Sequence, residues 1–315
     1  WYSVALLNQT PTFSTIQDAS SGTTPFTLSS SGTATVITVT ATDAEGQALT
    51  YNYSVSSGSL NGSTVSQNNN VFTVTPHASN AATFNLTFTA SDGVNTATSA
   101  AQAFTTQTNP IPDLNPLWYL SFENNLTNSG SYSGSLSKVG SADITYETTN
   151  AKIGSYSGDT GTSGTVNYDF PNNSISLTTA NTWSMGMWVK AHNLTSSDYI
   201  FDGRLGATSG TRLYITNTTI ASSLGNVTYS LGTGNWHHIV LVSDNANTSS
   251  KIYVDGSLEL NGTSPNNLGP QARLFNLYVS SNSVTYSFNG LIDEFFIYDG
   301  VLTAQEVTDI YNYTG

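Results

Sequence analysis

Residues 235–242 read Asn-Trp-His-His-Ile-Val-Leu-Val, and residues 251–256 read Lys-Ile-Tyr-Val-Asp-Gly. Residues 288–295 add a third segment, Phe-Asn-Gly-Leu-Ile-Asp-Glu-Phe. Each segment alternates in side-chain character as a β-strand does, and Asp255-Gly256 is a strong hairpin signal. The last quarter of the chain is therefore predicted to supply core strands of an antiparallel β-sandwich.

The same alternation begins again after a proline-rich stretch, so residues 117–315 are predicted to form one domain. Every second residue from Trp183 to Val189 is apolar and shares one strand face. Near the end of the chain the period changes. Thr303 and Glu306 have the spacing of a capping box, which predicts one short C-terminal helix.

The first part of the chain, residues 8–108, also alternates with period two between turn residues. Segments near residues 35–41, 49–55, 70–76 and 82–90 predict several short strands, which is typical of another antiparallel sandwich. Residues 109–116 contain three prolines and are predicted to be a stiff, extended linker. The fold class predicted is all-β, with two antiparallel β-sandwich domains.

Composition limits the partners of this 315-residue chain. Acidic residues outnumber Lys plus Arg by 20 to 7, which gives a formal net charge of -13. Because nucleic acids and anionic membranes bind basic patches, binding of either through charge is not expected. Cysteine is absent, and no apolar run reaches membrane-spanning length. Only 9% of residues are charged, and such a polar but uncharged surface favours packing against copies of the same chain.

The second domain resembles the laminin G-like, concanavalin A-type jelly rolls. The motifs that carry the resemblance are LWYLSFENN at residues 117–125, W-x-M-x-M-W-V-K at 183–190 and FNGLIDEFFIYDGVLTAQEV at 288–307. The first domain is similar to cadherin-like and immunoglobulin-like modules of bacterial surface proteins and of marine phage structural proteins. TATDAEG at 40–46 and VFTVTP at 71–76 carry that resemblance. Both resemblances imply binding or structural roles on a cell or virion surface.

Catalysis is not expected. Strand alternation would point Asp293 and Glu294 to opposite faces, so they would not form a facing carboxylate pair. The Glu-x-Asp-x-x-Glu pattern of the superfamily's glucanases is absent, so glycoside hydrolysis lacks its paired acids. No cofactor is required by any motif. His237 and His238 are strand neighbours, so they are predicted to be structural and not to chelate one metal ion.

Ca²⁺ is the one metal that the resemblance implies. In the second domain the implied ligands are Asp293 and oxygens of the loop from Glu123 to Asn128; the alternative is a carboxylate that accepts backbone N–H bonds. In the first domain the candidates are Asp43, Glu45 and Asp92, which fall at strand ends. The alternative is that these three residues form Asx-turns with their own backbone.

Two kinds of surface site are predicted besides metal. The candidates for stacking on a sugar are Trp188, Tyr214, Trp236 and Tyr253, and core packing is the alternative for all four. Sequons for N-glycosylation occur at Asn8, Asn52, Asn61, Asn85, Asn125, Asn172, Asn193, Asn217, Asn226, Asn247, Asn261 and Asn312.

Residues 1–7 precede the first sandwich and form an apolar, strand-like segment. Its candidate assembly residues are Trp1, Tyr2, Val4, Leu6 and Leu7. A lone strand is unstable in water, so this segment is expected to pair with a sheet, and pairing with a neighbouring copy would build an open filament. The function predicted is therefore a non-catalytic subunit of an extracellular or virion-surface fibre.

Two other functions are compatible with the sequence. The first is a lectin or adhesin that binds surface polysaccharide. The second is an accessory domain pair of a larger enzyme.

Overall fold

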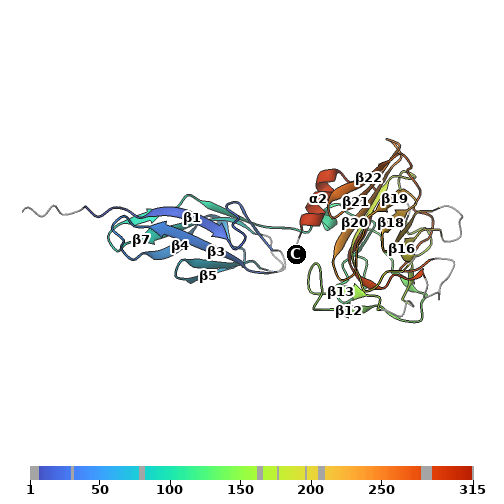
Figure 1. Ribbon diagram of the computed structural model, residues 1–315, viewed down its shortest axis with the longest axis horizontal. Coiled ribbons are helices and arrows are strands. Elements are labelled where there is room, and N and C mark those ends of the chain that lie inside the picture. The colour runs from blue at the N-terminus through green and yellow to red at the C-terminus, as the bar shows by residue number, and fades with distance from the viewer. Residues whose placement is uncertain are drawn as a thin grey trace, which may run out of the picture. The chain divides into compact units, whose positions relative to one another are not determined.

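The computed structural model describes residues 7–29, 32–77, 82–161, 166–175, 177–195, 197–204, 210–277 and 286–313 (Figure 1). The predicted assembly residues Trp1, Tyr2, Val4 and Leu6 lie outside these residues, and Leu7 is exposed and in no strand. The chain divides into two compact units, with the boundary between Thr108 and Asn109. The all-β prediction is confirmed.

The first unit is a sandwich of two sheets. One sheet has the strand order β1-β3-β6-β5 and the other β2-β9-β7-β4, with β8 added beside β7. Pairing is antiparallel except between β2 and β9. The strands are β1 (Thr12–Asp18), β2 (Phe26–Leu28), β3 (Thr35–Thr42), β4 (Thr50–Ser59), β5 (Thr64–Asn68), β6 (Val71–Thr75), β7 (Thr83–Ser91), β8 (Thr96–Thr98) and β9 (Gln102–Thr106).

The core of the first unit comes from alternate residues of both sheets. Ile37 and Val39 of β3 face Phe84 and Phe104 of the other sheet, and all four are almost fully buried. Their neighbours along each strand are mostly Thr and Ser at partly exposed positions. This apolar-in, polar-out alternation is the pattern on which the prediction of strands was based.

The segment predicted as an extended linker is instead one helical turn of the second unit, α1 (Pro110–Asp113). Asn109 is its N-cap, because its side chain accepts a hydrogen bond of 3.0 Å from the Ile111 backbone N–H. Proline suits the first turn of a helix, where its missing N–H is not needed and its fixed φ is already helical. The Ile111 side chain is buried against the sheet of the second unit, and the extended linker was therefore wrong.

The second unit is a sandwich of two larger sheets. The strand orders are β12-β13-β24-β15-β20-β21-β22, with β10 beside β24, and β11-β14-β23-β16-β17-β18-β19. The first of these is called the large sheet and the second the seven-stranded sheet. The principal core, which includes Trp118, Trp183 and Phe295, lies between them.

The strands of the large sheet are β10 (Trp118–Leu120), β12 (Thr145–Glu147), β13 (Ser157–Asp159), β15 (Trp183–Ala191), β20 (His237–Asp244), β21 (Ser249–Val254), β22 (Ser257–Gly262) and β24 (Gly290–Tyr298). Those of the seven-stranded sheet are β11 (Ser137–Lys138), β14 (Tyr168–Asp169), β16 (Asp198–Asp202), β17 (Arg212–Ile215), β18 (Thr219–Ser222), β19 (Gly225–Thr228) and β23 (Arg273–Leu274).

The hairpin and the C-terminal helix form where the sequence predicts them. Asp255 and Gly256 both have positive φ, 50° and 77°, as a tight two-residue turn between β21 and β22 requires. Thr303 and Glu306 make the complete capping box of helix α2 (Ala304–Asn312). Val307 and Ile310 of α2 are buried on the outer face of the large sheet, so one side of the sandwich is covered by α2 and α1 (Figure 1).

Candidate functional site

The outer face of the large sheet is occupied by the protein itself. Trp188 of β15 is 3% exposed, and its ring packs 5.5 Å from Tyr311 of α2 and 4.9 Å from His238. Tyr253 is 2% exposed and belongs to the apolar cluster that includes Val307 and Ile310 of α2. The prediction that these two rings stack on a sugar was wrong, because strand alternation identifies a shared face but not which face a helix covers.

The outer face of the seven-stranded sheet carries a pair of stacked tyrosines. Tyr199 of β16 and Tyr214 of β17 are cross-strand partners, with ring centroids 4.9 Å apart and an interplanar angle of 23°. Tyr214 lies between Leu213 and Ile215, which are both fully buried in the core, so its ring points outward. Tyr286 contacts Tyr199 edge-on at 6.2 Å. Tyr214 and Tyr286 are partly exposed, whereas Tyr199 is only 7% exposed, so Tyr214 is the ring of the stack that this face presents.

A row of alternating charges crosses the same face beside the tyrosines. Asp169, Arg273, Asp202 and Arg212 are successive cross-strand partners on β14, β23, β16 and β17. The Arg273 guanidinium donates two hydrogen bonds to Asp169, of 2.6 and 3.0 Å. Opposite charges directly across a sheet stabilise the pairing, so this row favours the observed register of the four strands.

A third arginine joins the row from the loop after β16. Arg204 donates two hydrogen bonds of 2.8 Å to the two carboxylate oxygens of Asp202, which is fully buried. Its pKa is raised, first by this hydrogen bond to Asp202 and also by the nearby Tyr199 hydroxyl. Arg204, Arg212 and Arg273 are the only arginines in the sequence, so all of them lie on this face. We call Tyr199, Tyr214, Arg204 and Arg212 the tyrosine–arginine face.

This face was only partly predicted. Of the four candidate stacking residues, Tyr214 alone lies on it, and Trp236 lies in the loop before β20, partly buried. Tyr199 and the arginines were missed, because they come from segments far apart in the sequence. The available signal was that every arginine falls within residues 204–273 of an acidic chain.

The carboxylates of Asp293 and Glu294 lie on the same side of β24, contrary to the prediction from alternation. Glu294 has a φ of 52°, and the register with β15 shifts by one residue at this point. Such a bulge lets two successive side chains face one way. Glu294 accepts hydrogen bonds from the Tyr119 hydroxyl (2.7 Å) and the Asn109 amide (2.8 Å).

Both carboxylates are buried beneath the helix-covered face. Burial raises the pKa of Glu294 to about 7. Burial and the neighbouring Glu294 charge raise the pKa of Asp293 well above its ordinary value. The two side chains are 0% and 3% exposed, so this pair has no surface on which to meet a substrate.

The implied Ca²⁺ ligands of the second unit hold backbone N–H groups. Asp293 accepts bonds from Lys152 and Ile153, and Glu123 accepts them from Ser155 and Tyr156, all between 3.0 and 3.2 Å. The Asn128 side chain joins the strand ends of its own loop through bonds to the backbone of Tyr119, Gly130 and Tyr132. These contacts fit the alternative to a Ca²⁺ site, in which the carboxylates accept backbone N–H bonds and order a loop.

The acidic residues of the first unit lie in turns. Asp43 accepts bonds from the backbone of Glu45 and Gln47, and Asp92 from that of Val94 and Asn95. These are Asx-turn contacts, and the Glu45 carboxylate accepts the Gln9 N–H. Within the described residues of either unit, no three His, Asp or Glu side chains are arranged to hold a metal ion.

The neighbouring histidines have opposite surroundings. The His237 ring lies 2.8 Å from both the Asp255 carboxylate and the Leu231 carbonyl, and the bond to Asp255 raises its pKa. His238 is buried beside Trp188, and burial lowers its pKa to about 3. The pKa values of the two rings therefore shift in opposite directions, and both rings make contacts within the protein.

Among the sequon asparagines, Asn8 and Asn85 are partly buried and the other ten are exposed. Asn226 is exposed on β19, where it is the cross-strand partner of Ala221, which itself pairs with Tyr214. A glycan on Asn226 would therefore stand close to the tyrosine–arginine face.

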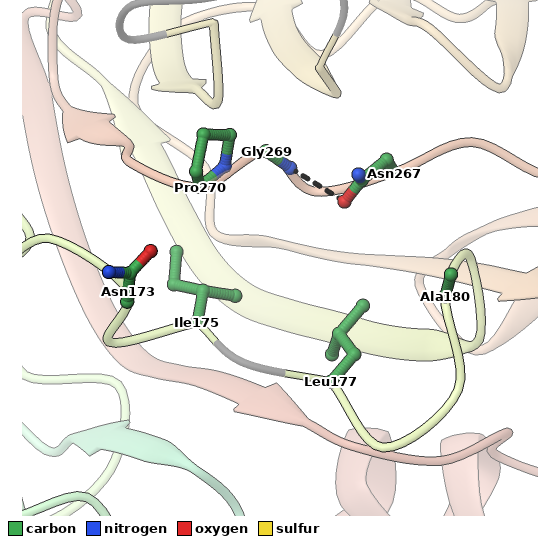
Figure 2. A pocket seen from close by; sticks show the side chains of 7 residues that line it. All are labelled: Asn173, Ile175, Leu177, Ala180, Asn267, Gly269 and Pro270. Atoms are coloured by element: carbon green, nitrogen blue, oxygen red, sulfur yellow. Dashed lines mark hydrogen bonds between the residues drawn. The ribbon is translucent and has the colours of Figure 1, made fainter.

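One end of the second unit has a pocket of about 460 Å³ (Figure 2). Its lining is Asn173, Ile175, Leu177, Ala180, Asn267, Gly269 and Pro270. Figure 2 shows Asn267, Gly269 and Pro270 on one side of the pocket, with the remaining lining residues on the other side. The lining has no aromatic ring and no charge, so it offers fewer recognition groups than the tyrosine–arginine face.

No described helix is both long and apolar enough to span a membrane. A comparison with curated protein sequences gives no match. Among solved structures, domain 4 of AbnA, an extracellular GH43 arabinanase from Geobacillus stearothermophilus solved with arabinotriose, is 24% identical, with a TM-score of 0.50. The match covers 62% of this chain and 98% of that domain.

The binding domain of botulinum neurotoxin serotype D/C VPI 5993 is 16% identical, with a TM-score of 0.50. That match covers 64% of this chain and 52% of the binding-domain chain, so it spans about half of that binding domain. At these identities both likenesses concern the fold alone. Residues 160–308 match the family described as the concanavalin A-like lectin/glucanases superfamily. The second unit therefore contains a laminin G-like domain of the concanavalin A type.

Proposed function

We propose that this protein is a non-catalytic carbohydrate-binding module of the cell or virion exterior, and that sugar binds on the tyrosine–arginine face. The observation that carries the proposal is the partly exposed Tyr214 ring, which stacks on the buried Tyr199 on the outer face of the seven-stranded sheet. Aromatic rings present an apolar surface on which the C–H groups of a sugar pack, and arginines supply hydrogen-bond donors for its oxygens. Arabinotriose in the structure of the arabinanase domain supports the choice of ligand class.

The proposal excludes hydrolysis for a structural reason. On the proposed face Asp169 and Asp202 are each bound by a guanidinium through two hydrogen bonds. Both oxygens of each carboxylate are occupied by these bonds, so neither group is placed to act as the acid or base that glycoside hydrolysis needs. Incubation with soluble polysaccharides should therefore release no reducing ends.

Replacement of Tyr214 by Ala should weaken sugar binding about tenfold or more, because the exposed ring of the stack is lost, and tenfold is about 1.4 kcal/mol. The ligand is first found on a glycan array with the intact chain, and affinities are then measured by calorimetry. Tyr156→Ala, which removes a partly exposed tyrosine beside β13, is the matched control. Ala180→Trp partly fills the pocket of Figure 2. Loss of affinity in Ala180→Trp but not in Tyr214→Ala would place the site in the pocket instead.

Fibre assembly is our second proposed function. The observation in its favour is that β4, ten residues long, is an edge strand with mostly exposed side chains. An edge of this kind pairs readily with another strand. Deletion of residues 1–7 should convert assemblies into single chains, as measured by analytical ultracentrifugation and electron microscopy. A full-length chain that sediments as a monomer would contradict this function and leave the carbohydrate proposal intact.

A further inference from the structure

We infer that the tyrosine–arginine face selects sugars that carry a carboxylate, and that the Arg212 guanidinium is the group that binds it. This inference rests on the proposed function and names its ligand class. Its starting point is the distribution of charge. In a chain with a net charge of -13, Arg212 and Arg273 lie on one face of one sheet, Arg204 joins them from the loop after β16, and the partly exposed Tyr214 lies on the same face.

The charge row across the sheet ends at Arg212. Along β14, β23, β16 and β17 the order is carboxylate, guanidinium, carboxylate, guanidinium. The residue beside Arg212 on the far side is Ser223, whose backbone and hydroxyl bond to the Arg212 backbone at 3.3 and 3.2 Å. Among the described residues, no carboxylate forms an ion pair with Arg212. A ligand carboxylate would take the next place in the row.

The other two arginines show how this face binds an anion. Arg273 holds Asp169, and Arg204 holds Asp202, each through two nearly parallel hydrogen bonds. The planar fork of a guanidinium matches the two oxygens of a planar carboxylate, and the resulting charge-assisted bonds are stronger than neutral ones. Arg212 is partly exposed, so its fork is within reach of a dissolved sugar.

Arg212 also stands at a suitable distance from the aromatic surface. It is two residues before Tyr214 on the same face of β17, and the rise along a strand separates their Cα atoms by roughly 7 Å. A sugar ring packed on Tyr214 would therefore bring a ring carboxylate, as in a uronic acid, toward Arg212. The acidic remainder of the protein repels polyanions that lack such a local contact, which favours recognition of an individual carboxylated ring.

The test measures binding of polygalacturonate, alginate and a glucuronate-containing polymer, each beside its carboxyl-reduced neutral form, with a sulfated galactan as a further probe. For at least one polymer the carboxylated form should bind tenfold or more tightly. Arg212→Gln should remove that difference and leave the affinity for the neutral form unchanged, and Arg212→Lys should restore part of it. Lys251→Gln, on the large sheet, removes the same charge elsewhere and should have no effect.

The outcomes separate this inference from the proposed function. Equal affinity for both forms of every polymer, with Tyr214→Ala still weakening binding, overturns the carboxylate and keeps the carbohydrate site. Tighter binding of the sulfated galactan than of any uronate also overturns it. Absence of binding to every polymer and to the glycan array overturns both. Circular dichroism of each variant establishes that a lost affinity is not lost folding.

Discussion

Replacement of Asp202 by Ala should lower the free energy of unfolding by about 3 kcal/mol or more, because breaking a buried ion pair from one side leaves its partner charge uncompensated. The Asp202 side chain is fully buried, and it accepts both hydrogen bonds of the Arg204 fork. It also stands between Arg273 and Arg212 in the charge row. Urea-induced unfolding, followed by tryptophan fluorescence, measures the loss.

The control for this prediction is an ion pair on the surface of the same unit. Lys138 and Asp143 are joined at 3.0 Å, but their side chains are 40% and 71% exposed. Exposed pairs contribute about 0–1 kcal/mol, so Asp143→Ala should change little. If Asp202→Ala costs no more than Asp143→Ala, the charge row does not stabilise the sheet. The Arg204–Asp202 pair would then no longer support the anion-binding geometry proposed for Arg212.

The alternation of side chains predicted which segments form strands and which residues share a strand face. It did not predict which segments pack against each face. The alternating residues of β15 lie where the pattern put them, with Trp183 in the core and Trp188 on the opposite face. Whether an outward face meets solvent depends on what packs there, and α2 comes from more than one hundred residues later in the chain. Trp188 was therefore assigned to the correct face but to the wrong environment.

Local irregularities account for the other differences. The alternation rule assumes an unbroken strand, and the bulge at Glu294 places it on the same side as Asp293. The proline-rich segment was expected to be extended, but the Asn109 cap makes it a helical turn. In both places the local structure depends on a single residue, through its backbone conformation or its side-chain hydrogen bond. The periodic pattern of the sequence does not predict such an effect.

The candidate site is a property of the sheet order. Tyr199 and Tyr214 become neighbours only when β16 pairs with β17. Arg273 joins them because β23 pairs with β16 across some seventy residues of sequence. Residue spacing contains no information about these pairings, and of these residues only Tyr214 was predicted. Three arginines in an acidic chain are costly to bring together unless carboxylates lie between them, and the charge row supplies those carboxylates.

Replacement of His238 by Phe should make the protein less sensitive to acid. Burial lowers the pKa of His238 to about 3, below the ordinary value of 6.5, so the unfolded chain binds a proton that the folded chain does not. The contribution of His238 to the free energy of unfolding is therefore fully present above pH 6.5. As the pH falls below this value, the free energy of unfolding decreases by about 1.4 kcal/mol for each pH unit, down to about pH 3. The free energy of unfolding of the variant minus that of the native protein should therefore be about 2 kcal/mol larger at pH 5 than at pH 7.5.

The comparison must be a difference between two proteins, because other groups titrate in the same range. Glu294, with a pKa raised to about 7, binds its proton more readily in the folded state, so its contribution favours folding as the pH falls from 7 toward 4.5. That contribution is common to both proteins and cancels. Phe also removes the His238 Nδ1 atom, which is buried and has no hydrogen-bond partner among the described residues, and keeps a ring against Trp188. Parallel denaturation curves, with a gap that does not change between pH 7.5 and pH 5, would show that His238 accepts a proton in the folded state and that burial does not keep it neutral.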